Sequence, residues 1–209
     1  MTVKVAWGFV LVATVFLSPT PAVAVTDVIG GTDNSSLANP WDGKGNVFRI
    51  DSSVFLREHE FFLNFSGSQS ISYYVYRSPS EFGTYDLVQS NSILHNGIGD
   101  AWYSSGPINV MLHSADHYLL AFSYDSSTTP VTTYYFNTAE TLPVSFGAYV
   151  HGFATGVHPL GATVNSGSND QAVYYHRITT TEVPEPASLL LAAGGLIAVG
   201  HRRRWRREE

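Results

Sequence analysis

The central part of the chain, residues 25–183, carries the apolar pattern of β-strands. Short runs of aromatic and β-branched residues recur between clusters of Gly, Pro, Asn, Asp and Ser, and no long window repeats apolar residues at positions i, i+3, i+4 and i+7. The runs predict nine strands, at residues 46–50, 60–65, 71–76, 85–90, 108–112, 117–124, 131–136, 144–150 and 172–178. Nine short strands without a helix indicate an all-β domain, and we expect a single β-sandwich.

Alternation along the predicted strands assigns side chains to the two faces of a sheet. Ile71, Tyr73 and Val75 point to one side, which we expect to be the core, so Tyr74 and Tyr76 should share the solvent face. Turns should fall at residues 66–68, 78–80, 96–97 and 125–127, where Gly allows positive φ and Asp, Asn or Ser can bond the local backbone. These turns would form hairpin or Greek-key corners.

Composition narrows the classes of function for residues 25–183. This segment has five Lys and Arg against fourteen Asp and Glu, a formal net charge of −9, which argues against nucleic acid as a partner. The chain has no cysteine, so a disulfide framework, thiolate metal sites and a cysteine nucleophile are all excluded. A segment of this length is within the usual range for one domain, which must be held together by packing.

The beginning of the chain has the pattern of a secretory signal peptide. Lys4 supplies a positive charge, residues 5–17 are apolar, and Ala22 and Ala24 form a small-x-small site for signal peptidase. Cleavage after Ala24 would remove residues 1–24 and start the mature chain at Val25. We therefore expect residues 25–183 to be exported.

The last 27 residues combine a proline motif, an apolar run and a basic end. Val183, Pro184, Glu185 and Pro186 come first, and the two prolines should keep the backbone around Glu185 extended and accessible. Residues 187–200 carry no charge and would span roughly 21 Å as a helix, short of the ~30 Å hydrocarbon core. Five arginines follow and should lie on the cytoplasmic side of a transmembrane helix, where their long stems can cover the missing length: Arg202, Arg203, Arg204, Arg206 and Arg207.

This order of signal peptide, exported domain, Pro-Glu-Pro motif, short apolar helix and arginine cluster resembles the PEP-CTERM proteins of Gram-negative bacteria, which are sorted by exosortases. The resemblance implies export, an inner-membrane precursor, recognition of residues 184–209 by a membrane-embedded exosortase related in its chemistry to cysteine transpeptidases, and transfer to the cell surface or an extracellular polysaccharide matrix. An ordinary membrane anchor with a coincidental Pro-Glu-Pro is the alternative. The arginine cluster does not indicate nucleic-acid binding, because it adjoins an apolar segment.

Residues 45–125 also resemble, more loosely, an extracellular sandwich module that occurs beside such sorting tails. The resemblance is carried by the segments at residues 46–50, 61–65, 74–76, 99–103 and 111–124. It implies a jelly-roll-like topology and no particular activity.

No catalytic, metal or cofactor site is indicated by the motifs of residues 25–183. His113 and His117 have the i, i+4 spacing of a zinc pair, but they lie between two strand-patterned runs and lack the Glu of H-E-x-x-H, so we expect a turn there. A nucleophile elbow and a phosphate-binding loop are absent from the sequence. The acidic residues that a glycosidase would need are candidates by residue type alone: Glu58, Glu60, Glu81 and Asp100.

Tyrosine is the one residue type with a functional implication. Tyr74, Tyr76 and the doublets at residues 134–135 and 174–175 should each place a ring on the solvent face, where it can stack on a sugar. Tyrosine is also a common half-buried strand residue. Three hypotheses remain open: a non-enzymatic structural or adhesive surface protein, which we favour; a module that binds exopolysaccharide through Tyr74 and Tyr76; and a secreted hydrolase.

Overall fold

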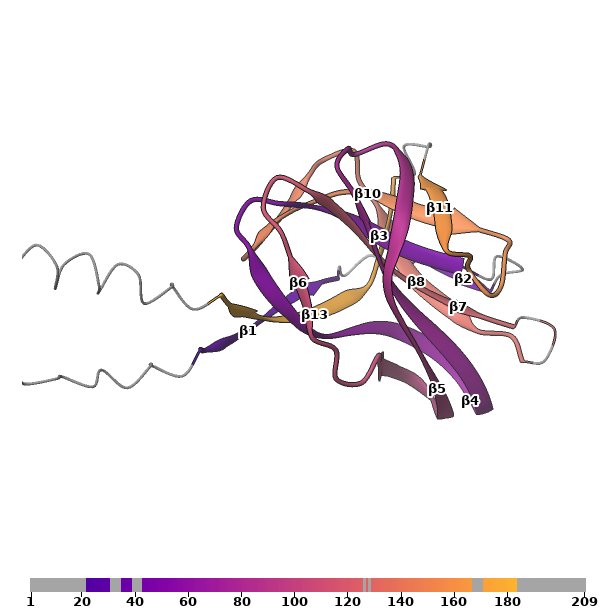
Figure 1. The fold of residues 1–209 in the computed structure, drawn as a ribbon. Coiled ribbons are helices and arrows are strands. Elements are labelled where there is room, and N and C mark those ends of the chain that lie inside the picture. Colours follow the sequence, from indigo (N-terminus) through magenta and orange to yellow (C-terminus); the bar gives the residue numbers. More distant parts are fainter. Residues whose placement is uncertain are drawn as a thin grey trace, which may run out of the picture.

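The computed structural model describes residues 22–30, 35–38, 43–125, 127, 129–166 and 171–183, and in them the protein is all-β with no helix. Figure 1 shows the strands wrapped into one body. The thirteen strands are β1 (Ala24–Ile29), β2 (Ser35–Ala38), β3 (Gly43–Ile50), β4 (Val54–Ser78), β5 (Gly83–Ser104), β6 (Val110–Leu112), β7 (His117–Tyr124), β8 (Thr132–Asn137), β9 (Leu142–Val144), β10 (Gly147–Thr155), β11 (Thr163–Ser166), β12 (Ala172–Tyr174) and β13 (His176–Glu182).

All of these strands belong to one sheet, whose central path runs β1-β13-β4-β7-β3-β10-β9. Strand β4 joins the two halves of the sheet, because its first part pairs with β13 and β6 and its last part pairs with β7. The sheet is therefore nearly closed and barrel-like. The all-β prediction is confirmed, while the two separate sheets of the expected jelly-roll-like sandwich are not seen, because one long strand belongs to both halves.

Strands β4 and β5 bend together and fold back on themselves. They pair from Glu60 and Ser104 to Arg77 and Asp86, with one register shift between Val75 and Tyr76. In a straight strand, residues 59 and 73 would be roughly 46 Å apart at about 3.3 Å per residue. Their rings are in fact 5.5 Å apart, so the β4–β5 ribbon has a sharp bend between them. Gly67 (φ +80°) lies opposite Gly97 at this bend, next to Gly99 (φ +93°).

Two of the predicted turns are part of this bend and do not connect separate strands. Residues 66–68 and 96–97 do change the direction of the chain, but both lie within strands and pair with each other, so they are not hairpin corners. Four of the nine predicted strands have other bounds in the structure: 60–65 and 71–76 merge into β4 through the bend, and, apart from the bend, 144–150 is divided between β9 and β10 and 172–178 between β12 and β13. The strand predicted at 117–124 is β7 with the same bounds.

Two large clusters fill the interior of the sheet. One lies between its two halves and includes Phe48, Leu56 and Leu120, and the other lies within the bend and includes Phe61 and Tyr73. The predicted core face of β4 is confirmed, since Ile71, Tyr73 and Val75 are all buried. A third cluster lies on the opposite face of β4, β3 and β7, so both faces of the sheet are covered there. It consists of Val47, Tyr74, Tyr76, Tyr85, Leu119, Ala121, Phe153 and Leu160.

The two ends of the described chain lie side by side. β1 pairs with β13 in antiparallel fashion, from Ala24 opposite Thr181 to Ile29 opposite His176. Figure 1 shows both strands at the same side of the body. Within the described part of the chain no helix is long and apolar enough to cross a membrane. The predicted transmembrane helix and most of the sorting signal, including Pro184, Glu185, Pro186 and the five arginines, lie outside the described residues.

Candidate functional site

Four aromatic rings meet on the outer face of the sheet, opposite the interior of the bend. Alternation along β4 buries Phe61, Leu63 and Phe65 and turns Phe62 outward. Trp102 of β5 is the cross-strand partner of Phe62, with ring centroids 5.3 Å apart. Tyr134 of β8 and Tyr175, between β12 and β13, complete the group at 5.1 Å and 6.4 Å from Phe62. We call Phe62, Trp102, Tyr134 and Tyr175 the aromatic face.

Polar side chains surround the aromatic face. Arg177 lies over the Trp102 ring, with its guanidinium carbon 4.5 Å from the ring centroid, and its Nη1 donates to Glu60 Oε2 at 3.0 Å. At the other end, the Tyr134 hydroxyl and the Asn64 amide both donate to Asp100 Oδ1. The hydrogen bond to Asp100 raises the pKa of the Tyr134 hydroxyl above its ordinary value, so this group remains a donor at neutral pH.

The aromatic face joins accessible ring surface to donors and acceptors in one place. Phe62, Trp102 and Tyr134 are half-buried, while Tyr175 is buried beneath them. Aromatic rings provide apolar area for the C–H face of a sugar, and carboxylate, amide and guanidinium groups can bond its hydroxyls. This combination suits an uncharged saccharide better than a lipid or an anion.

The structure contradicts the predicted exposure of Tyr74 and Tyr76. They share one face of β4 as expected, with centroids 5.8 Å apart, but they are only 4% and 0% exposed. The segment between β10 and β11 covers them: the Leu160 amide donates to the Tyr74 hydroxyl at 3.3 Å, and the Tyr76 hydroxyl donates to the Gly161 carbonyl at 2.8 Å. Neither ring is available to a glycan in this arrangement.

The tyrosine doublets fit the prediction only in part: Tyr134 is half-buried, whereas Tyr174 and Tyr175 are both buried, so the solvent-facing ring expected at residues 174–175 is not found. Tyr135 and Tyr174 pack with the interior cluster at the bend, while Tyr134 and Tyr175 belong to the aromatic face. Sequence reasoning missed Phe62 and Trp102. Strict alternation in residues 60–65 would have placed the Phe62 side chain on the outer face. Its pairing with Trp102, which lies 40 residues further along the chain, depends on the register between β4 and β5.

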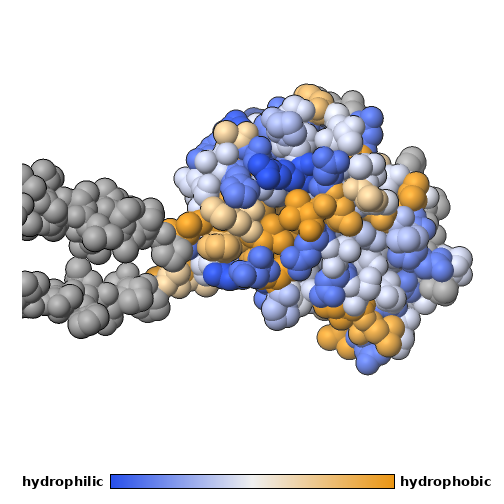
Figure 2. All heavy atoms as spheres, viewed as in Figure 1, coloured by the Kyte–Doolittle hydropathy of each residue, from blue (hydrophilic) through white to orange (hydrophobic). Residues whose placement is uncertain are grey.

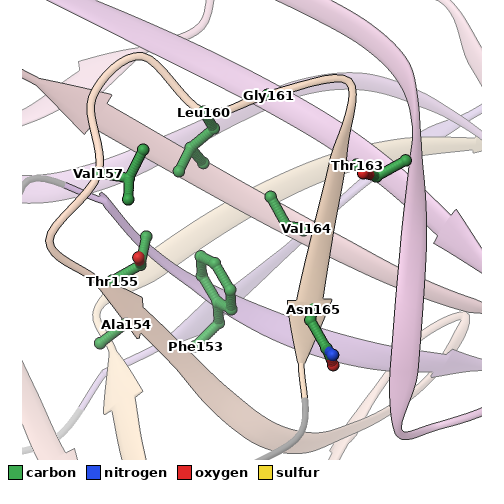
Figure 3. Close-up of a pocket in the computed structure, with 9 residues that line it drawn as sticks. All are labelled: Phe153, Ala154, Thr155, Val157, Leu160, Gly161, Thr163, Val164 and Asn165. Carbon is green, nitrogen blue, oxygen red and sulfur yellow. The ribbon is translucent and has the colours of Figure 1, made fainter.

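A pocket of about 240 Å³ lies in the segment that covers Tyr74 and Tyr76. Figure 3 shows Phe153 and Leu160 pointing toward one another across it, with Val164 beside them. Thr155, Thr163 and Asn165 contribute the polar part of its lining. The pocket has no cluster of charged groups, and we assign it no ligand.

A hydrogen-bonded pair of histidines is buried in the core. Asn46 of β3 is fixed by two bonds to the backbone of Tyr174, so its amide nitrogen must donate to His176 Nδ1 at 3.3 Å. His176 then carries its proton on Nε2 and donates to His59 Nδ1 at 3.2 Å. His59 must carry its own proton on Nε2, which is buried and has no partner. This pattern of hydrogen bonds places one proton on each imidazole ring, so both rings are neutral.

Burial keeps both rings neutral. His59 stacks edge-on against Phe61 and Tyr73, and His176 lies flat on Phe61 at 4.1 Å. Loss of solvent lowers the pKa of His59 to about 3, and burial together with His59 lowers that of His176 well below its usual value. These histidines form a structural element of the core.

The segment predicted as a turn at residues 113–117 is a turn. It joins β6 to β7 through Ala115, which has φ +68°, and His113 and His117 lie at the ends of these strands. Among the described residues no group of three or more His, Cys, Asp or Glu could hold a metal ion. Glu58 accepts from Ser104, while Glu60 and Asp100 have the partners given above, and Glu81 lies away from them in the turn before β5.

The two predicted processing sites adjoin the β1–β13 pair. Ala22 and Ala24 are exposed, and Val183 follows the last residue of β13. Cleavage after Ala24 would remove a single residue of β1 and leave the pairing from Val25 to Ile29 intact.

We expect N-terminal sequencing of the exported protein to begin at Val25. The small side chains of Ala22 and Ala24 fit the signal peptidase, and a bulky charged residue does not, so Ala24→Arg should abolish cleavage there. Val28→Arg, on the exposed side of β1, is the matched control and should leave the start unchanged. A mature start beyond Gly31 would contradict the boundary.

Residues 182–204 match the PEP-CTERM protein-sorting motif, whereas no curated protein matches the chain. The match confirms the resemblance drawn from the sequence of the tail. It implies that the chain is exported, processed at the membrane and recognised by an exosortase.

Proposed function

We propose that this chain is an exported protein of the cell surface or extracellular matrix, sorted by its PEP-CTERM motif, whose β domain is a non-catalytic structural or adhesive module. Its sorting motif begins at Glu182, the last residue of β13, so the folded domain is joined directly to the sorting signal. Two of the acidic residues considered for a glycosidase take part in interactions within the domain. Glu60 pairs with Arg177, and Asp100 accepts from Tyr134 and Asn64.

A second candidate function, binding of the exopolysaccharide, is favoured by the aromatic face. The observation that carries it is the grouping of Phe62, Trp102 and Tyr134 with the donors and acceptors around them. Because the domain has a formal charge of −9, electrostatics disfavour an acidic polysaccharide at low ionic strength. Stacking on neutral sugars does not depend on charge, so we propose that the ligand is a neutral segment of the polysaccharide.

The test is retention of the protein on the extracellular polysaccharide of the producing cells. Replacing Trp102 and Tyr134 together by alanine removes two accessible rings, and a loss of about 1.4 kcal/mol for each ring would weaken binding roughly a hundredfold. Retention of the unchanged protein should vary little between low and high salt. Affinity electrophoresis in gels that contain the polysaccharide measures both effects.

Phe82→Ala is the matched control, since Phe82 is an aromatic residue 48% exposed in the turn before β5, away from the aromatic face. It should bind as the unchanged protein does. Equal retention of the Trp102→Ala/Tyr134→Ala variant, once circular dichroism has shown that it folds, would remove the carbohydrate candidate and leave the structural or adhesive one.

A further inference from the structure

The bend of the β4–β5 ribbon carries the most exposed apolar side chains outside the chain ends. Leu94 is 71% exposed and Ile98 is 84% exposed. Asn96 lies between them and is exposed on the same side of β5. In Figure 2 hydrophobic residues gather at the lower end of the molecule, where Figure 1 places the end of this ribbon. We call Leu94, Asn96 and Ile98 the apical patch.

The apical patch cannot be explained by packing within the domain. Gly67 and Gly99 lie in open space, since a Cβ atom there would meet nothing within 4 Å, and Asn96 Oδ1 accepts from the Ser68 hydroxyl at 2.8 Å, while Leu94 and Ile98 stay exposed. Burial of apolar area is favourable by about 25 cal/mol for each Å², so two aliphatic side chains as exposed as Leu94 and Ile98, on the same side of one strand, favour a contact with another molecule.

Charge indicates what this contact is. Residues 61–76 of β4 and 87–99 of β5 contain no Asp, Glu, Lys or Arg, although the domain has a formal charge of −9. Two copies of such an acidic domain repel each other over most of their surfaces. The bend is a region where two copies can approach without placing carboxylates against carboxylates.

The apical patch lies on the side of the domain opposite the two ends of the described chain. The chain leaves the domain at β1 and β13, and Figure 1 shows these strands on the side opposite the end of the β4–β5 ribbon. The apical patch is therefore covered by neither end of the described chain and is accessible to another molecule.

We propose that the apical patch is an interface between two copies of this chain. Leu94 and Ile98 lie four residues apart with Asn96 midway, so a two-fold axis at Asn96 brings Leu94 of each copy against Ile98 of the other. Such a contact is small and weak between free molecules. It becomes effective because sorting gathers many copies on one surface and so raises their local concentration.

The absence of cysteine allows a direct test in the full chain on the producing cells. Asn96→Cys introduces one thiol at the axis, and a short bismaleimide should then join two copies into a dimer seen on a denaturing gel. Ser90→Cys is the matched control: it lies on the same exposed side of β5 but six residues from the axis, so it should give at most a tenth of that dimer.

A second variant tests whether the crosslinked dimer depends on the side chains of Leu94 and Ile98. Leu94→Ser and Ile98→Ser, added to Asn96→Cys, should reduce the crosslinked dimer at least fivefold, and both positions are exposed enough for the domain to fold unchanged. No dimer with Asn96→Cys, an equal dimer with Ser90→Cys, or a dimer that survives the serine changes would overturn the proposal. Crosslinks to proteins of other mass in place of the dimer would also overturn it and identify a different partner.

Discussion

Between pH 7 and pH 5 the domain should lose roughly 2 kcal/mol of its stability through the buried His59 alone, and His176 should add to this loss. The folded-state pKa of His59 is about 3, against 6.5 for an unfolded histidine, so acid protonates the unfolded chain first. The contribution of the neutral His59 to the free energy of unfolding is therefore fully present above pH 6.5. It is lost as the pH decreases toward 3. The loss from His59 at pH 5 is roughly 2 kcal/mol, and His176, whose pKa is also lowered by burial, changes stability in the same direction. Total stabilities of domains are only about 5–15 kcal/mol.

Urea unfolding of residues 25–183 at a series of pH values measures this loss. A His59→Gln/His176→Gln variant should lose most of the slope of stability against pH, whatever its absolute stability at pH 7. The slope that remains belongs to His95 and His117, whose pKa values burial also lowers. A wild-type profile that is flat from pH 7 to 5 would contradict the neutral pair.

The largest effect on processing should come from the sorting motif. Replacement of Pro184, Glu185 and Pro186 by alanine restores flexible backbone and removes the acidic group that precedes the apolar run. We expect the precursor to remain in the membrane fraction and the processed form to be lost. Immunoblots of membrane and released fractions distinguish the two forms by mass.

Arg202→Ala is the comparison variant for this experiment, because four arginines remain to hold the end of the chain on the cytoplasmic side. It should be processed almost as well as the unchanged protein. Normal processing of the triple-alanine variant would show that the Pro-Glu-Pro sequence is not what the exosortase reads.

Local signals in the sequence predicted single strands well and their assembly poorly. The apolar alternation of residues 117–124 and the turn before them depend only on neighbours, and both are found where expected. The Ser-rich and Gly-containing segment at 66–70 has the composition of a loop, yet it continues β4 because β5 pairs with it through the bend. Such pairing is a property of two distant segments.

The candidate site shows the same limit. Periodicity correctly placed Tyr74 and Tyr76 on one face, but whether that face meets water depends on residues 156–162, which come from far along the chain and cover it. Periodicity also placed one ring of each tyrosine doublet on the opposite face from its neighbour, and these rings are Tyr134 and Tyr175 of the aromatic face. The contribution of Trp102 requires the β4–β5 register, which no local pattern specifies.

The place where the chain leaves the domain has a mechanical consequence. A pull on the tail acts at Glu182 and runs along β13, which is paired with β4 from His176 to Glu182 on one side and with β1 on the other. A force parallel to paired strands loads their hydrogen bonds together in shear, whereas a force across them would open the bonds one after another. A pull on the end of β13 would therefore be resisted by the hydrogen bonds of both strand pairs at once.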